Sequence, residues 1–512
     1  MKPLKQVLSL SFLILMSAPQ AEVKALSGYT VDTESLCGGF PKVALKTKDD
    51  TCLGLVATEE SGLKRPRRIL SVGEGLFVVT DMYGWVANKG IVWLFDSQSG
   101  KLTKLFDKVD QAHGLGLGPD GLIYVGTRSS IFRFNLNNHL ETKETVINDL
   151  PLEGNHPLTH FIFDGSGNLI VNVGAPSDQC LDDKDRPQYP CPASESNNPE
   201  ASLRLYFRNS AGAYPSYKVI AKGLRNSMAL AIEPQSGRLF QGENGMDFKA
   251  ADTPLEEINL IKEGAHYGWP YCYEDGKLND KYKRTFLNRR VPKIKCSEYE
   301  APVAHLPAHS APLDMMFYQG DLFPEFQGKL IVSLHGYRET GHRIVSLDLN
   351  EQLIPQENTR SEIVTNWTAE TGLTPKGSPV GMTTDEEGNI WFVEDKNKTI
   401  MVLTRGDSNL GNVQGETRQI KLSDEQVSEY REIDKMIFAQ NCQSCHDQFS
   451  GDPKVVVPEL IKSGLIKPGL GKDSPLFQRL IGTEAGQRMP IGSAPIKSDL
   501  SEKLKIFIDS LK

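Results

Sequence analysis

The sequence has no excess of positive charge and, beyond its first residues, no long apolar run. Its 512 residues carry 57 Lys and Arg against 65 Asp and Glu, a formal net charge of −8. No basic stretch is present to neutralise phosphates, which argues against a nucleic-acid-binding protein. A membrane span needs roughly 20 apolar residues, so no span is expected either. The 39% of hydrophobic residues is ample for a folded core and excludes a disordered chain.

The first residues predict an export signal. Lys2 and Lys5 form a basic start, residues 7–16 are apolar, and residues 17–21 supply small side chains for cleavage. The apolar run has only about ten residues, which is too short for a membrane anchor. We therefore expect residues 1–21 to be a cleaved signal peptide and the protein to be periplasmic or secreted.

Cysteine is scarce, and its eight positions divide into two groups. In an oxidising compartment cysteines are expected to pair. Six of them allow several pairings, of which the most local are Cys37–Cys52, Cys180–Cys191 and Cys272–Cys296. Each bridge would close a loop and add about 3 kcal/mol of stability by the chain-entropy estimate.

A turn followed by an apolar run recurs along the chain. The copies lie at residues 73–79, 119–125, 165–171, 235–240, 327–332 and 387–393. Their Asp-Gly, Ser-Gly and Gly-Asn pairs accept positive φ and favour hairpins. Dividing residues 26–404 by six gives about 63 residues per unit, enough for the four strands of a propeller blade. We therefore predict an all-β, six-bladed β-propeller over residues 26–404.

Polar residues precede the inner strand of each unit, and a propeller brings such positions to one end of its central channel. They are Arg67, His113, His156, Arg225 with Asn226, His309, and Lys376 with Ser378. The next strand returns to the same end and finishes at Asp81, Arg128, Glu243, His335 and Asp395. A site rich in Arg, Lys and His suits an anionic ligand, and a histidine can supply a general base.

The last part of the chain has a different character. Residues 405–424 are polar and predict a linker, and a helix is expected over residues 424–439. Residues 425–512 are predicted to form a small all-α domain. Its closing helix is marked by one apolar face, which consists of Leu500, Leu504, Phe507 and Leu511.

This small domain carries a haem-attachment motif. Cys442 and Cys445 are three residues apart and His446 follows directly, so both sulfurs can bond the haem vinyl groups while the imidazole ligates iron. Met489 is the candidate for the other axial ligand, because a thioether raises the potential of a haem. A thioredoxin-type pair or a fourth disulfide would not explain the adjacent histidine. We therefore predict a cytochrome c domain with haem c.

Several segments of the propeller region resemble one enzyme family. They are Gly-Leu-Arg-Asn-Ser at 223–227, Glu-Ile-Asn at 257–259, Tyr-Gly-Trp-Pro at 267–270, and His-Ser-Ala-Pro-Leu at 309–313 followed by Phe-Tyr at 317–318. In this order they resemble the pyrroloquinoline quinone (PQQ)-dependent sugar dehydrogenases of the soluble glucose, L-sorbosone and pyranose dehydrogenase kind. The resemblance covers roughly residues 36–404 and implies a six-bladed propeller.

The resemblance also implies roles for individual residues. His156 matches the catalytic base that takes the hydroxyl proton, and Arg225 the cation beside the quinone oxygen. Asn226 would bind the cofactor, and the backbone carbonyls of Gly245 and Met246 would hold the PQQ-bound calcium. The candidates for contacts to PQQ are Arg67, His335, Arg338 and Lys376.

The sequence departs from the family pattern at three places. The arginine that often follows the base by four residues is His160 here. The segment before the last unit reads Gly-Ser-Pro at 377–379, and the loop at 335–338 is shortened to His-Gly-Tyr-Arg. These departures affect the expected contacts to the PQQ carboxylates and the expected substrate pocket. They affect the role expected of His156 as the base less.

The two regions together predict a periplasmic or secreted quinohaemoprotein dehydrogenase. It would oxidise a sugar, or another alcohol or aldehyde, at PQQ–calcium and pass electrons to its own haem and then to an external acceptor, a cytochrome or quinone chain. A calcium-dependent lactonase is an alternative, with Glu243 and Asp395 as metal ligands, although hydrolysis has no use for a haem. A non-catalytic binding propeller with an attached electron-transfer cytochrome is the third.

Overall fold

The computed structural model describes residues 23–48, 50–286, 288–336, 338–365, 367, 377–406, 422–439, 449, 451–462, 465–481, 496 and 498–511. The chain divides into two compact units, residues 1–412 and residues 413–512, which are described separately below. Several predictions fall on positions outside the described residues: the signal peptide 1–21, Lys376, Cys442, Cys445, His446 and Met489.

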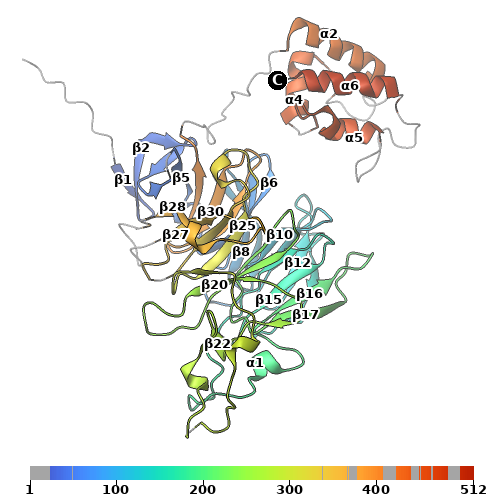
Figure 1. Ribbon diagram of the computed structural model, residues 1–512. Helices are drawn as coiled ribbons and strands as arrows, with labels where there is room; N and C mark the ends of the chain where they lie inside the picture. Colours follow the sequence, from blue (N-terminus) through green and yellow to red (C-terminus); the bar gives the residue numbers. More distant parts are fainter. Residues whose placement is uncertain are drawn as a thin grey trace, which may run out of the picture. The chain divides into compact units, whose positions relative to one another are not determined.

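The first unit is an all-β propeller, as predicted (Figure 1). It has five blades whose strands follow in near-consecutive chain order, where six were predicted. The first blade is β6–β9 (Pro66–Gly73, Leu76–Asp81, Gly90–Asp96, Lys101–Val109). The second is β10–β13 (Leu115–Leu117, Ile123–Gly126, Ile131–Phe134, Glu144–Ile147). The third is β14–β17 (Phe161–Phe163, Leu169–Val173, Ser202–Phe207, Ser216–Lys222), extended by β21 (Ala265–His266).

The fourth and fifth blades follow the same plan. The fourth is β18, β19, β20 and β24 (Ala229–Ile232, Leu239–Glu243, Glu256–Leu260, Ala304–Leu306). The fifth is β25–β28 (Pro312–Phe317, Leu330–Leu334, Arg343–Leu347, Ser361–Thr365), extended by β4 (Lys46–Thr47). A separate two-stranded ribbon is β22 and β23 (Cys272–Tyr273, Lys277–Leu278).

The remaining sheet is composite and corrects the picture of six equal, consecutive units. It has seven strands in the order β1-β2-β3-β5-β31-β30-β29. Their bounds are Val23–Leu26, Tyr29–Cys37, Phe40–Val43, Cys52–Ala57, Thr399–Thr404, Ile390–Glu394 and Pro379–Thr384. The two ends of the propeller region thus lie side by side, blue against orange in Figure 1. Pairing β5 with β31 covers an edge that β31 would otherwise expose.

The predicted turns lie where the strands reverse. Gly121 and Gly167 have φ of +74° and +79°, a conformation that glycine adopts without steric cost. Between blades the sheets pack through large side chains. Trp391 of β30 lies 4.5 Å, ring centre to ring centre, from Phe77 of β7, so the composite sheet packs against the first blade.

Arg68 of β6 bonds to residues of two other blades. Its Nη2 donates to the carbonyls of Met228 (2.7 Å) and Leu313 (2.8 Å), and Nη1 pairs with Asp314. Asp314 also accepts the backbone N–H of Met382 in β29 at 2.7 Å. One buried guanidinium therefore links the first blade to the fourth and fifth, and through Asp314 to the composite sheet.

The three predicted disulfides are confirmed: Cys37–Cys52, Cys180–Cys191 and Cys272–Cys296. The first joins β2 to β5 within the composite sheet. The other two hold long loops, one of which contains the short helix α1 (Pro192–Glu195).

The short 3-10 helices span Glu59–Ser61, Asp280–Tyr282, Cys296–Glu298, Pro324–Phe326, Glu357–Thr359 and Gly471–Asp473.

The described part of the second unit is helical. Its helices are α2 (Asp424–Ile433), continued by a π-helical turn (Asp434–Phe438), α4 (Pro453–Lys462), α5 (Pro475–Ile481) and α6 (Ser498–Ser510). Ser423 begins α2 with a reciprocal cap, its Oγ accepting the N–H of Gln426 at 3.1 Å. The predicted apolar face of the last helix is buried at Leu504 and Phe507. Among the described residues, no helix is long and apolar enough to cross a membrane.

Candidate functional site

A cavity of about 460 Å³ opens at one end of the propeller channel. Residues from every blade but the second and from the composite sheet supply its walls, and five cationic side chains outnumber three carboxylates there. The cations are Arg65, Arg67, Arg225, Arg338 and Lys396, and the carboxylates are Asp247, Glu256 and Asp395. Many sequence-predicted residues line this cavity: Arg67, His156, Arg225, Asn226, Gly245, His309, His335, Arg338 and Asp395. The excess of positive charge suits an anionic ligand.

His156 precedes β14 and is held in one tautomer. Its Nδ1 lies 2.6 Å from the carbonyl oxygen of Ala175, which can only accept, so Nδ1 carries the proton. Nε2 is thereby left as an acceptor. Burial, and next the charge of Arg225, lowers the pKa of His156 to about 4, so the imidazole is neutral at pH 7. This side chain has the protonation state that a general base requires.

Arg225 lies in the loop between β17 and β18 and is fixed by acidic and carbonyl groups. Its Nη2 contacts Asp247 at 2.7 Å and Asp178 at 2.9 Å, and Nη1 donates to the Asn244 carbonyl at 3.0 Å. Its own carbonyl accepts the N–H of Ala175 at 2.7 Å. The residue that orients His156 is therefore also bonded to Arg225, which fixes the base and the cation relative to each other.

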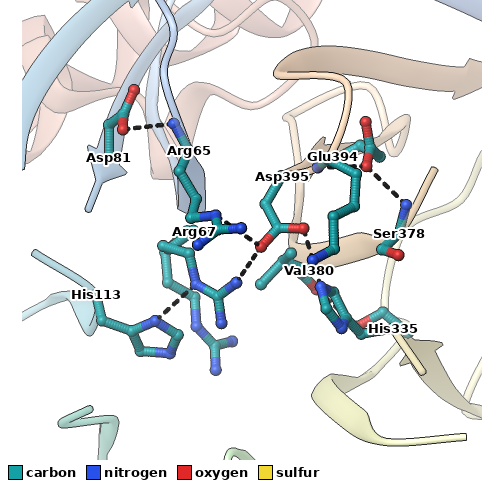
Figure 2. A network of polar contacts seen from close by, with 12 residues as sticks. Arg65, Arg67, Asp81, His113, His335, Ser378, Val380, Glu394 and Asp395 are labelled. Carbon is teal, nitrogen blue, oxygen red and sulfur yellow. Dashed lines mark hydrogen bonds and ion pairs between the residues drawn. The ribbon is translucent and has the colours of Figure 1, made fainter. Parts of the chain in front are cut away.

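A second network joins the first blade to the composite sheet (Figure 2). Arg67 Nη1 lies 2.5 Å from Asp395 Oδ2, and its Nε donates to His113 Nδ1 at 3.1 Å. His335 Nε2 donates to Asp395 Oδ1 at 2.9 Å. Burial alone would raise the pKa of Asp395, but His335 and Arg67 hold that pKa well below its usual range. Asp395 is thus an ionised bridge between two cavity-lining side chains.

We predicted that Arg67 precedes the first strand of its blade. It lies instead inside β6 (Pro66–Gly73). The register of β6 against β7 shifts between Pro66 and Arg68. The irregularity leaves Arg67 out of the ladder. It can therefore reach His113 and Asp395 while Arg68 enters the channel.

Buried carboxyl groups support the fourth-blade loops. Glu243 accepts the backbone N–H groups of Arg225 and Asn226. Glu256 accepts those of Gly245 at 2.5 Å and Ala311 at 3.2 Å. Burial raises the pKa of Glu243 to about 8 and of Glu256 to about 7. These groups therefore position the segments that face the cavity.

Five of the predicted polar residues do not line the main cavity: His113, Ser378, Asp81, Arg128 and Glu243. Met246, of the predicted calcium segment, does not line it either. Our expectation that residues flanking the inner strands all face the channel mouth is wrong for these five, and Asp81 and Glu243 bond to backbone N–H groups instead. Asp81 accepts the N–H groups of Lys64 (2.7 Å) and Arg65 (2.8 Å). The Ser378 hydroxyl lies 3.3 Å from His342 Nδ1.

Arg338 and His309 line the cavity but are bonded to its rim. Arg338 donates to the carbonyls of Phe248 (3.2 Å) and Ala250 (2.8 Å), and His309 Nε2 donates to Ala250 at 2.7 Å. Both therefore hold the loop after Met246. The carboxylates that fix Arg225, Asp178 and Asp247, were missed. Asp247 directly follows the predicted calcium segment, whereas Asp178 comes from a distant loop without a sequence signal.

The geometry argues against the lactonase alternative. Asp395 is bonded to Arg67 and His335, and Glu243 to backbone N–H groups. Within the part of the chain that the structure describes, no three His, Cys, Asp or Glu side chains are grouped to hold a metal ion. Carboxylate ligands for a hydrolytic metal are therefore not assembled by these residues.

Comparison with known proteins agrees with this architecture. Residues 54–406 match the family described as TrAA12-like. The chain belongs to the TrAA12-like family. The TrAA12-like region contains every described residue of the cavity, from Arg65 to Lys396.

Solved structures share the fold of the TrAA12-like region. The calcium structure of the family AA12 enzyme from Trichoderma reesei superposes with a TM-score of 0.57 at 21% identity, covering 71% of this chain and 97% of that one. The holo PQQ domain of pyranose dehydrogenase from Coprinopsis cinerea superposes with a TM-score of 0.56 at 18% identity, covering 72% of this chain and 100% of that one. At these identities the likeness concerns the fold.

Two curated relatives are named as sugar dehydrogenases. The PQQ-dependent sugar dehydrogenase of Hypocrea jecorina is 24% identical over 333 residues, 57% of this chain and 73% of that protein. Aldose sugar dehydrogenase YliI of Escherichia coli is 27% identical over 205 residues, which make up 37% of this chain and 48% of that protein. The alignments with the first three curated relatives span 46%, 48% and 32% of those proteins, about half their length or less.

Proposed function

We propose that the TrAA12-like region is a PQQ- and calcium-dependent dehydrogenase that oxidises a sugar, or another alcohol or aldehyde. The observation that carries the proposal is one cationic cavity in which a neutral His156, with Nε2 unprotonated, is fixed relative to Arg225. The names of the two sugar dehydrogenase relatives agree with this chemistry.

The residues of the cavity fit PQQ, which carries three carboxylates. The lining has more cations than carboxylates, and Arg225 Nε and Asn226 Oδ1 are buried polar atoms without a hydrogen-bond partner among the described residues. These two atoms offer a donor and an acceptor to a ligand. The carbonyls of Gly245 and Met246 would hold calcium, an ion that prefers oxygen ligands. Arg67, His335 and Arg338 are the proposed contacts to PQQ, with Lys376 as a sequence-based addition.

The protein's own residues then have defined tasks. PQQ with calcium, when bound, would supply an electrophilic quinone that accepts a hydride from the substrate carbon, that is, one proton together with two electrons. His156 Nε2 accepts the proton of the substrate hydroxyl, and Ala175 keeps the proton on Nδ1. Arg225 stabilises negative charge beside the cofactor, and Asp178 and Asp247 hold its guanidinium in place.

The path of the electrons rests on the sequence of the second unit. We propose that Cys442 and Cys445 bind haem c, with His446 and Met489 as axial ligands, and that this cytochrome passes electrons to an external acceptor. Export by the signal peptide 1–21 would place the protein in the periplasm or outside the cell.

The composite sheet would serve as the sixth blade of the propeller.

Turnover with a soluble dye as acceptor tests the proposal. The protein is purified without PQQ, reconstituted with PQQ and Ca²⁺, and assayed with a panel of aldoses, ketoses and simple alcohols. We expect oxidation that requires PQQ and is lost on chelation of calcium. No oxidation of any panel member by a protein that binds PQQ would overturn the proposal. Hydrolysis of lactones without PQQ would favour the lactonase alternative instead.

A further inference from the structure

Trp85 differs from every other tryptophan of the chain in its exposure. It is 59% exposed, whereas Trp93, Trp269, Trp367 and Trp391 are each 8% exposed or less. Trp85 also lines the 460 Å³ cavity. Leaving a large aromatic ring in water forfeits the free energy of burying it, so such a ring at a cavity mouth indicates a binding surface.

The loop that carries Trp85 is firmly held at its base. Asp81, at the end of β7, accepts the N–H of Tyr83 at 2.8 Å as well as those of Lys64 and Arg65. The next side chain, Met82, is fully buried, and its N–H donates to the Arg65 carbonyl at 3.0 Å. The loop therefore presents the indole from an ordered base. A pre-positioned ring gives up little conformational entropy on binding.

The cavity combines apolar and polar groups in a way that suits a sugar ring. Its apolar lining includes Trp85, Leu158, Met228, Phe248 and Leu313. The polar lining includes His156 and the charged groups of Arg65, Arg225 and Asp247. A pyranose has an apolar C–H face and an edge of hydroxyl groups, so it can place the first on an aromatic ring and the second on polar side chains.

We propose that Trp85 is the face on which the pyranose ring of the substrate stacks, so that it determines the preference for cyclic sugars over small acyclic alcohols. The inference rests on the proposed sugar dehydrogenase function and deepens it. His156 would act on the substrate whatever its size, whereas Trp85 would contribute binding only when a ring is present. Trp85 is thus a specificity-determining residue.

Three variants in the full-length, PQQ-reconstituted protein test this role. Trp85→Ala removes the ring, Trp85→Phe keeps an aromatic face, and Val86→Ala is a matched control. Val86 belongs to the same loop and is 55% exposed, but it is not among the residues that line the cavity. We expect Trp85→Ala to raise KM for aldopyranoses by about tenfold, with KM for a small acyclic alcohol unchanged. Trp85→Phe and Val86→Ala should stay within about twofold of the parent.

A binding measurement separates this inference from the proposed function. The PQQ-free protein is titrated with aldopyranoses while tryptophan fluorescence is recorded. A saturable change that Trp85→Phe abolishes is expected, because the other four tryptophans are buried. Such binding without any sugar oxidation would refute the proposed function and leave the Trp85 role standing.

Other outcomes overturn the role of Trp85. Sugar oxidation with a KM that Trp85→Ala does not change would refute it and leave the proposed function standing. If neither binding nor oxidation of sugars is observed, both are wrong. If Trp85→Ala and Val86→Ala both slow reduction of a protein acceptor but leave the sugar KM unchanged, the loop docks a redox partner and the stacking role is refuted.

Discussion

Replacement of Asp395 by Asn tests the buried network at the cavity floor. Asp395 is 4% exposed and bridges Arg67 at 2.5 Å and His335 at 2.9 Å. An asparagine has the same shape, but it has only one acceptor oxygen, and an N–H₂ donor group replaces the other oxygen. One of the two donors would therefore face an N–H₂ group, and the charge of Arg67 would lose its buried counter-charge.

The magnitude of the effect follows from burial. Removing one partner of a buried ion pair costs about 3–5 kcal/mol of unfolding free energy. At about 2.1 cal/mol/K per residue, the roughly 350 residues of the TrAA12-like region have an unfolding entropy near 0.7 kcal/mol/K. Asp395→Asn should therefore lower the Tm of the propeller by roughly 4–7 °C.

Differential scanning calorimetry measures this shift. Glu263→Gln is the matched control, because Glu263 forms an exposed ion pair with Lys218 at 2.7 Å, and such pairs contribute little. We expect the control to melt within about 1 °C of the parent. An Asp395→Asn protein that also melts within about 1 °C would refute the assignment of Asp395 as an ionised bridge.

The effect should also depend on pH in a defined direction. His335 and Arg67 hold the pKa of Asp395 well below its usual value despite burial. The stability that this carboxylate contributes is therefore present above a pH of about 4 and is lost as the pH falls through the lowered pKa. The Tm difference between parent and Asp395→Asn should be constant from neutral pH down to about pH 4 and shrink below it.

Three further predictions concern the proposed base and the proposed haem. His156→Ala should reduce turnover by about 10²–10⁴-fold in steady-state assays without changing the haem spectrum, and unchanged turnover would exclude His156 as the base. In the parent, kcat/KM should fall with acid only as the pH drops through about 4, which is the lowered pKa of His156, because the protonated ring cannot accept a proton. A fall in kcat/KM near pH 6.5 would contradict the assignment of His156 as the base. Met489→Ala should remove the sulfur–iron absorption band and lower the haem potential in a redox titration, and if neither changes, the sixth ligand lies elsewhere.

Features set by local sequence could be predicted. The recurring turn and apolar run identified the hairpins, because a turn and the strand that follows it are neighbours in the chain. Positions relative to those strands then placed His156, Arg225 and His335 around one cavity. The three disulfides were also predictable, because each closes a short stretch of chain.

Features set by long-range pairing could not be predicted. The composite sheet joins β5 to β31, from opposite ends of the propeller region, and neither strand signals its partner. Asp178 reaches Arg225 from a loop with no periodic pattern, so its role depends on tertiary structure alone. Arg67 lies at a register shift within β6, which displaced it from the position expected before the strand. Such an irregularity has no sequence period that would reveal it.

Sugar-dependent reduction of the proposed haem tests the central proposal most directly. The full-length protein is mixed anaerobically with PQQ, Ca²⁺ and a sugar from the panel, and the haem Soret band is followed with time. The account predicts that the band shifts to its reduced position only when PQQ, Ca²⁺ and sugar are all present. A haem that stays oxidised with every sugar tested, in a protein shown to bind PQQ, would contradict it.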